Sequence, residues 1–193
     1  MIVPNPDRRS ERARRAILSA ALELCVEESF ARLTMEGVAK RAGVGKQTIY
    51  RWWPSKSAVL LEAIDDRAGD TLDFPDTGDL VADLRTQMIQ LARTLTDPVF
   101  AASLRGLIAA AQSDADAAES LYRTLMKPRV ELCAERLKKA QQAGQVRPEV
   151  APEDLIELLY APLYYRLLLQ HRPIDEAQIG TILDLIFPSL APA

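Results

Sequence analysis

The chain contains 193 residues, of which 48% are hydrophobic and 26% are charged. These proportions are typical of a globular protein with one large or two small domains, and they exclude an intrinsically disordered chain. The longest stretch without a charged residue, Leu185–Ala193, spans only nine residues, and the N-terminus lacks the apolar core of a secretory signal. We therefore expect a cytoplasmic protein with no membrane partner.

Side chains that carry out most enzymatic chemistry are scarce. The chain has one histidine, His171, two cysteines, Cys25 and Cys133, and eight glycines that form no phosphate loop or dinucleotide fingerprint. Two cysteines do not make a disulfide framework, so we expect both thiols to be reduced. This composition predicts a protein that is not an enzyme and that holds no metal or cofactor.

The formal net charge of −3 hides an uneven distribution. Residues 1–56 contain eleven Lys/Arg and six Asp/Glu, which gives +5, whereas residues 57–193 contain thirteen Lys/Arg and twenty-one Asp/Glu, which gives −8. A basic N-terminal quarter on an acidic remainder is expected of a small polyanion-binding module attached to a larger body. Charge alone leaves a second interpretation open, in which this is an ordinary solvated basic face.

Apolar residues recur at helical spacing along the whole chain, and the alternating runs typical of strands are missing. The sequence therefore predicts an all-α fold. Ser55 is expected to cap the fourth helix, Asp73–Gly78 to form a turn, and Pro128 and Pro162 to kink the helices that contain them. The nine predicted helices cover about residues 8–29, 35–42, 46–52, 56–70, 79–95, 98–112, 115–142, 152–170 and 175–187.

Residues 34–56 carry the sharpest pattern in the chain. Gly43 stands where the first of two short helices must end in a left-handed residue, which glycine adopts at the lowest cost. Ile49 and Trp53 give the second helix a buried face. The inner face of the first helix consists of Val38, Ala39 and Ala42, and alanine lets the second helix cross closely. This pattern predicts a helix-turn-helix, whose second helix lies in the DNA major groove.

The exposed positions of this motif are candidates for DNA contacts. Lys46 and Gln47 stand at the tip of the second helix, where side chains meet base edges; lysine suits guanine and glutamine suits adenine. Tyr50 and Trp52 can hydrogen-bond to phosphates, although a place in the core stays open for both. We expect Lys56 to contact a phosphate at the start of the fourth helix. The predicted DNA contacts are Thr34, Lys46, Gln47, Thr48, Tyr50, Arg51, Trp52 and Lys56.

At these residues the sequence resembles the TetR family of bacterial transcription regulators. The match runs over about residues 10–61 and departs from the family pattern at Gly37 and at Gly45, which replaces a small polar residue before the recognition helix. The resemblance implies a homodimer with a helical C-terminal domain that binds a small ligand and changes the spacing of the two DNA-reading heads. We therefore expect a DNA-binding domain over residues 8–56 and an effector-binding and dimerisation domain over residues 57–193.

The C-terminal region supplies apolar stripes with few polar groups, the usual composition of a small-molecule site. The stripe around Tyr122 is also compatible with a plain core. We expect Arg105 or Tyr122 to orient a hydrophobic effector. The predicted effector contacts are Ile64, Met88, Arg105, Ile108, Tyr122 and Met126, and the predicted dimer contacts are Tyr164, Leu167, Leu168, Ile182, Leu185 and Ile186.

Together these features predict a dimeric repressor that binds a palindromic double-stranded DNA operator and is released by a small hydrophobic effector. The sequence does not separate a repressor from an activator or from a regulator without a ligand. The alternative from another class is an all-α small-molecule-binding protein or enzyme without DNA-binding function.

Overall fold

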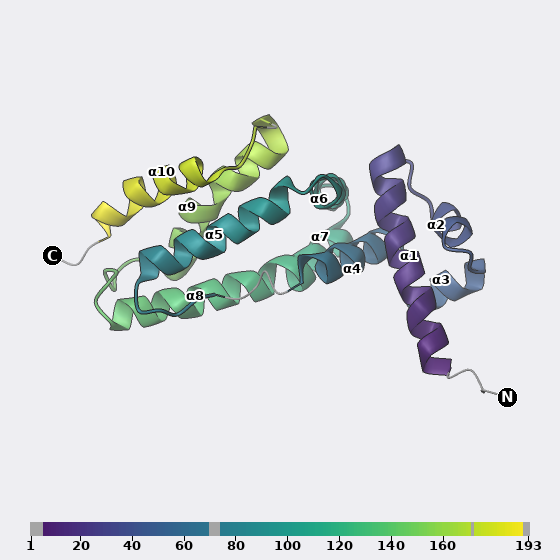
Figure 1. Cartoon of the computed structure of the whole chain (residues 1–193), viewed down its shortest axis with the longest axis horizontal. Helices are drawn as coiled ribbons and strands as arrows, with labels where there is room; N and C mark the ends of the chain where they lie inside the picture. The colour runs from purple at the N-terminus through teal and green to yellow at the C-terminus, as the bar shows by residue number, and fades with distance from the viewer. Residues whose placement is uncertain (1–5, 70–73, 171, 191–193) are drawn as a thin grey trace. The chain divides into compact units, whose positions relative to one another are not determined.

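The computed structural model describes residues 6–69, 74–170 and 172–190, so His171 and the first residue of the predicted turn, Asp73, lie outside it. Every regular element within the described residues is helical, which confirms the all-α fold class (Figure 1). The helices are α1 (Pro6–Glu28), α2 (Met35–Arg41), α3 (Lys46–Trp52), α4 (Lys56–Ala68), α5 (Leu80–Thr96), α6 (Pro98–Ala111), α7 (Ala115–Leu121), α8 (Lys127–Gln142), α9 (Pro152–Tyr165) and α10 (Glu176–Ile186).

The predicted helix over 115–142 is interrupted. A π-helical turn, Tyr122–Met126, separates α7 from α8 and ends two residues before Pro128. Proline has no N–H to donate and its ring crowds the preceding turn, so a wider turn at this place relieves both problems. The second predicted kink differs, because α9 continues through Pro162 and widens into a π turn only at Arg166–Gln170.

Contacts divide the chain into two compact units that are not consecutive in sequence. The first comprises the residues up to Arg67 together with Pro98–Thr124, and the second comprises Ala68–Asp97 and Leu125 onward. The helices α6 and α7 therefore pack with the N-terminal helices. The predicted division after residue 56 concerns the roles of the two parts, and it stays a prediction.

In the first unit, α1 packs against both α2 and α6. The apolar residues of α1 that recur at helical spacing are buried: Ile17, Ala20, Ala21, Leu24 and Cys25. The helix α6 approaches closely because Gly106 has no side chain: a Cβ atom there would lie 2.4 Å from the Cβ atom of Phe30. Glycine at this position thus allows α6 to lie against the residues that follow α1.

The turn between α2 and α3 follows the predicted geometry. Gly43 has a φ of 67°, in the left-handed region. The N–H of Gly43 donates to the carbonyl of Lys40 at 3.2 Å, and the N–H of Val44 donates to the carbonyl of Ala39 at 3.0 Å. These two bonds form a Schellman motif, which ends α2 and directs the chain into α3.

The second unit is built from α5, α8, α9 and α10, which lie side by side (Figure 1). A buried ion pair joins two of them: Arg136 of α8 donates from both Nε and a terminal nitrogen to the carboxylate of Asp83 on α5, at 3.0 and 2.6 Å. The two residues are 4% and 1% exposed. The backbone N–H and hydroxyl of Thr77 complete the hydrogen bonding of the carboxylate.

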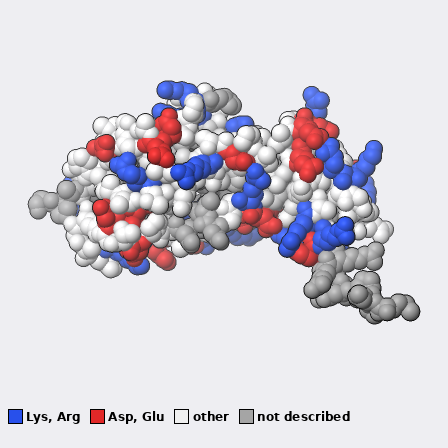
Figure 2. Space-filling model, viewed as in Figure 1, with Lys and Arg blue, Asp and Glu red and all other residues white. Residues whose placement is uncertain are grey.

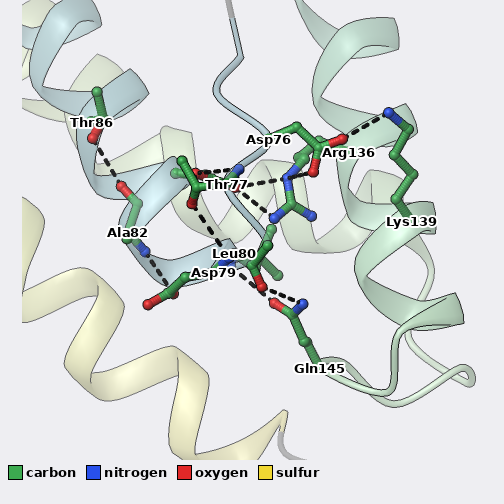
Figure 3. Close-up of polar contacts among 11 residues, drawn as sticks. Asp76, Thr77, Asp79, Leu80, Ala82, Thr86, Arg136, Lys139 and Gln145 are labelled. Carbon is green, nitrogen blue, oxygen red and sulfur yellow. Dashed lines mark hydrogen bonds and ion pairs between the residues drawn. The ribbon is translucent and has the colours of Figure 1, made fainter.

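The same network fixes the turn before α5. Asp76 accepts from Lys139 at 2.9 Å, and the Gln145 side chain accepts from the N–H of Leu80 and donates to the carbonyl of Gly78 (Figure 3). Burial alone would raise the pKa of Asp83, but the hydrogen bonds from Thr77 and Arg136 lower it below its ordinary value. The carboxylate is therefore charged at neutral pH and holds the turn against α5 and α8.

Candidate DNA interface and effector pocket

The recognition helix α3 is held by its apolar side. Ile49 is fully buried and Trp53 is 4% exposed, as their spacing predicts. The indole N–H of Trp53 donates to the carboxylate of Glu62 on α4 at 2.6 Å, and the other oxygen of that carboxylate accepts from Arg14 of α1 at the same distance. One carboxylate thus joins three elements behind α3 and sets the direction in which its outer face points.

The outer face of α3 carries most of the predicted DNA contacts. The side chains of Lys46, Gln47, Tyr50 and Arg51 are exposed, while Thr48 and Trp52 are partly exposed. The guanidinium of Arg51 lies 5.3 Å from the ring centre of Trp52. Thr34 caps α2 by accepting from the N–H of Gly37 at 3.1 Å.

An acidic residue that the sequence reasoning missed stands on this face. The Glu36 carboxylate of α2 lies 2.6 Å from the Nζ atom of Lys46, and it accepts a longer hydrogen bond from the hydroxyl of Tyr50 at 3.5 Å. The hydrogen bond to Glu36 raises the pKa of Lys46. The position of Glu36 in the sequence does not indicate this contact, because the contact depends on how α2 and α3 cross.

Lys56 has partners other than the predicted phosphate. Its Nζ atom donates to the carbonyls of Phe30 and Ala31, at 2.8 and 3.3 Å, and lies 4.6 Å from the ring centre of Phe30. Lys56 therefore connects the start of α4 to the segment after α1. The predicted cap of α4 is present, since the hydroxyl of Ser55 accepts from the N–H of Ala58 at 3.2 Å.

A groove of about 890 Å³ runs between the first turns of α1 and the α2–α3 turn. It adds two residues that the predicted DNA contacts leave out, Ser10 and Arg12, beside Thr48 and Arg51. The sequence feature that points to this region is the group of arginines at the start of α1, which includes Arg12. The groove brings two guanidinium groups to one side of the helix-turn-helix.

Several cations of the basic N-terminal quarter form ion pairs within the first unit. Arg14 pairs with Glu62 and with Asp66, and Arg41 pairs with Glu27 at 2.7 Å. Acidic and basic side chains accordingly lie next to one another over α1–α3 on the face seen in Figure 2. Glu62 and Asp66 lie beyond residue 56 and are not counted in the net charge of +5, which therefore overstates the positive charge of this part of the molecule.

The second unit contains a narrow cavity of about 70 Å³ between α5, α8 and α9. Of the six predicted effector contacts, Met126 lines it and Met88 lies fully buried in the same unit. The other four, Ile64, Arg105, Ile108 and Tyr122, belong to the first unit. The described lining residues are Phe74, Gln87, Leu91, Met126, Arg129, Val130, Cys133, Ile156, Tyr160 and Tyr164.

The predicted effector contact of Tyr122 requires an inward-pointing side chain, and Tyr122 is largely exposed in the single chain. Its side chain is 52% exposed, whereas Leu125 in the same turn is buried. The expectation assumed α-helical spacing through residues 121–126, and the π turn breaks that spacing.

The predicted dimer contacts separate into two groups. Tyr164 lines the cavity, and Leu167 and Ile182 are buried within the protomer; Leu168 and Ile186 are partly exposed and Leu185 is 75% exposed. Three further large apolar residues of α9 and the π turn that follows it are exposed and were not predicted: Leu158, Tyr165 and Leu169. On this side a groove of about 820 Å³ reaches Gln178, whose buried Oε1 atom has no hydrogen-bond partner among the described residues.

Neither a metal site nor a membrane span is found in the described part of the chain. No cluster of three or more His, Cys, Asp or Glu side chains is arranged to hold a metal ion there. No described helix is long and apolar enough to cross a membrane.

Comparison with known proteins places this geometry in a family. Residues 17–63 match the model of bacterial regulatory proteins of the tetR family, and residues 74–186 match the tetracyclin repressor-like C-terminal domain. The chain is 38% identical over 178 residues to the HTH-type transcriptional regulator YdeS of Bacillus subtilis, covering 92% of this chain and 88% of YdeS. It is 29% identical over 180 residues to the DNA-binding transcriptional repressor TetR of Mycobacteroides abscessus, covering 91% and 92% of the two chains.

Solved structures agree with this placement. The crystal structure of the TetR family transcription regulator SCO0332 matches with a TM-score of 0.75 and 39% identity over 93% of this chain and 99% of that one. A structure of the regulator FadR from Bacillus subtilis in complex with stearoyl-CoA has the same fold, with a TM-score of 0.76 and 18% identity over 91% of this chain and 98% of that one. The helix-turn-helix, the all-α fold and these relatives together show that the chain is a DNA-binding transcriptional regulator, not an enzyme, and belongs to the TetR family.

Proposed function

We propose that this regulator is a homodimeric repressor that binds a two-fold-symmetric operator and leaves it when a small molecule occupies the cavity of the second unit. DNA binding is assigned to residues 8–56, and effector binding and dimerisation to residues 57–193. The observation that carries the proposal is the polar outer face of α3, held outward by the buried Ile49 and Trp53.

On DNA, the tip of α3 reads base edges. Gln47 and Lys46 extend from its first turn and suit adenine and guanine in the major groove. Arg12 and Arg51, which line the groove beside the α2–α3 turn, supply cations for phosphates. Contacts to phosphates fix the position of the protein on the DNA and make the affinity depend strongly on the salt concentration.

The exposed apolar residues of α9 and α10 support a two-fold interface. Leu158, Tyr165, Leu169 and Leu185 are all more than half exposed in the single chain. Because α9 and α10 contact each other, large apolar residues exposed on both helices support an interaction surface there. A second copy seated on the same face would bury all four and give an isologous contact, the commonest form of homodimer.

The cavity supports the effector part of the proposal. Its lining is mostly apolar with a few polar groups, but a volume of about 70 Å³ is well below the 300–1,000 Å³ or so of typical ligand sites. A ligand must therefore separate α5, α8 and α9. Such a ligand favours an expanded state of the second unit, and a differential affinity of about 1–3 kcal/mol between two states is typical of allosteric release.

Selection of bound duplexes from a random pool tests this function. The expected result is enrichment of one palindromic sequence, with an affinity that falls steeply as salt is raised. A scrambled duplex of equal length is the control. Equal affinity for both duplexes would contradict specific regulation, and enrichment of a non-palindromic single site would contradict the dimer.

A further inference from the structure

The groove on α9 carries opposite charges at its two ends. Asp154 and Glu157 stand in the first two turns of α9 and line the groove. Arg166 and Arg172, which also line it, come after the last residue of the helix. These are the four charged residues among the described residues of the lining. The groove is therefore acidic at the start of α9 and basic at its end.

An apolar stretch separates the two ends. Leu158 and Tyr165 are both more than half exposed. Leu158 lies three positions before Ala161, and Tyr165 lies three positions after Pro162, so the two are equally spaced about the centre of the groove. Ala161 is exposed and has only a methyl side chain, so another helix can approach α9 closely at this point.

Beside Pro162 the groove contains an unpaired acceptor. The Gln178 side chain is buried, and its Nε2 atom donates to the carbonyl of Pro162 at 3.3 Å. Its Oε1 atom has no hydrogen-bond partner among the described residues. A buried carbonyl oxygen without a donor is costly. We therefore expect the molecule that fills this groove to bring a hydrogen-bond donor.

We propose that the groove receives the same face of a second copy, with the two α9 helices antiparallel and crossing at Ala161 and Pro162. In a two-fold contact, residue i meets residue j of the partner, and residue j meets residue i. The acidic start of each α9 then faces the basic end of the partner's helix. Leu158 packs against Tyr165 of the partner subunit, whose hydroxyl supplies the donor for Gln178. The pairing rests on the homodimer of the proposed function, to which it adds a register and the charges that select the partner.

The charges favour this orientation over a parallel one. A parallel arrangement would bring the two acidic starts together and the two basic ends together. Like charges at an interface cost free energy, whereas opposite charges select the partner and its orientation. A related regulator with a different order of charges along this helix is disfavoured for the same reason. The groove thus favours homodimers over mixed dimers.

Charge reversal at the two ends of the groove tests the pairing on the full chain. One variant carries Asp154→Arg and Glu157→Arg, and the other carries Arg166→Glu and Arg172→Glu. Each variant alone places like charges at both ends of the contact, so its dimer dissociation constant is expected to rise at least about 100-fold. An equimolar mixture restores opposite charges at both ends, and we expect it to form mixed dimers with an affinity close to that of the parent chain.

Native mass spectrometry distinguishes the mixed dimer from the two homodimers by mass. The same four charges lie near the ends of α9, where they can also interact with the dipole of this helix. That interaction acts within one chain and does not change on mixing, so formation of the mixed dimer separates the two roles. The matched control is Glu119→Arg with Glu135→Arg, two exposed acids outside the groove, which is expected to leave the dimer unchanged.

A neutral variant covers the case in which a reversed chain does not fold. Asp154→Asn with Glu157→Gln keeps the shapes of both side chains. It is expected to weaken the dimer several-fold and to make its dissociation constant less dependent on salt. A salt dependence equal to that of the parent chain would contradict the contact between the acidic start and the basic end.

Tyr165→Phe tests the donor for Gln178. Without the hydroxyl, the Oε1 atom of Gln178 stays unpaired in the dimer, so the dissociation constant is expected to rise several-fold, up to about tenfold. Tyr122→Phe, at an exposed tyrosine of the first unit, is the control. An unchanged dissociation constant in Tyr165→Phe would overturn the assignment of this hydrogen bond.

The mass of the parent chain keeps the two proposals distinguishable. If the parent is a dimer and the two reversed variants form no mixed dimers, or each keeps the parent's affinity by itself, the antiparallel pairing is overturned and the proposed homodimer remains. A monomeric parent contradicts the homodimer itself, and the pairing with it, because the groove then binds a different partner.

Discussion

Glu36 and Lys46 form an ion pair of 2.6 Å between α2 and α3, on the side of the helix-turn-helix that carries the recognition residues. The same carboxylate accepts from the hydroxyl of Tyr50. In the absence of DNA, the Glu36 carboxylate thus contacts Lys46 and Tyr50, two of the side chains that are predicted to bind DNA. Because both partners are more than half exposed, the pair itself contributes little to folding stability. We expect the pair to affect the affinity for DNA instead.

Glu36→Gln is expected to strengthen binding to DNA of any sequence. The substitution releases Lys46 and removes an anion from a surface that approaches phosphates, so affinity for operator and scrambled duplexes rises several-fold and the salt slope steepens by about one unit. Fluorescence anisotropy over a salt series measures both. Glu28→Gln, an exposed acid at the end of α1, is the control. Weaker operator binding in Glu36→Gln would mean that the carboxylate itself reads a base.

Lys56→Ala is expected to lower stability as well as DNA affinity. The substitution removes the two hydrogen bonds from Nζ to the carbonyls of Phe30 and Ala31, a loss of about 1–3 kcal/mol in the free energy of unfolding. Urea denaturation measures this loss. Lys40→Ala, at an exposed position of α2, controls for removal of a charge. If Lys56→Ala leaves stability unchanged and only weakens DNA binding, Lys56 acts on phosphates alone.

The two glycines of the α2–α3 turn are expected to respond in opposite ways. Gly43→Ala costs about 1–2 kcal/mol, because its φ of 67° is unfavourable for a residue with a Cβ atom although no atom lies within 4 Å. Gly45→Ser stabilises α3 by a few tenths of a kcal/mol, since the φ of −72° is ordinary and α3 has no side-chain cap. Thermal unfolding compares the two variants. Equal changes in Tm would contradict this interpretation of the turn.

Leu185→Glu is expected to convert the proposed dimer into a monomer and to weaken operator binding. A charge within an apolar interface must be desolvated without a partner, whereas in the single chain this side chain is 75% exposed and tolerates it. Light scattering after size-exclusion chromatography gives the mass. Leu132→Glu, at another exposed leucine on α8, is the control. A Leu185→Glu dimer would place the interface elsewhere.

Asp83→Asn is expected to destabilise the second unit by about 2–4 kcal/mol, because the buried Arg136 then keeps only its longer contact, 3.5 Å, with the partly exposed Asp76. The pKa of Asp83 is lower in the folded chain than the ordinary value of 3.8, so its contribution is complete above that value and is lost as pH falls below it. Denaturation as a function of pH measures this: the variant should differ from the parent at pH 7 and approach it in acid. A constant difference over the whole range would contradict the ionic role of Asp83.

The fold could be predicted from the sequence because its signals are local. Gly43 marks the left-handed end of α2, and Ile49 and Trp53 mark the buried side of α3, since each of these depends on spacing along one helix. The TetR-like pattern adds the same information over residues 10–61, and the comparisons confirm the family.

The missed or misplaced site residues depend on relations between helices. Glu36 meets Lys46 only through the crossing of α2 and α3, and Tyr122 is exposed because a π turn follows α7. Arg105 stands out in the sequence because it is the one charged residue of α6, whereas Arg129 has Lys127 and Glu131 close by and does not stand out. Only the rotation of α8 against α5 and α9 shows that Arg129 is the one that lines a cavity.

The close approach of Gly106 to Phe30 has a consequence for protein engineering and for the evolution of such regulators. The chain leaves the first compact unit after Arg67, returns at Pro98 and leaves again after Thr124. A fragment cut after α4 would therefore uncover the part of α1 and Phe30 against which α6 packs. A transplant of the DNA-reading helices onto another regulator has to carry residues 98–124 with them, so the exchangeable module is two separate stretches of the gene.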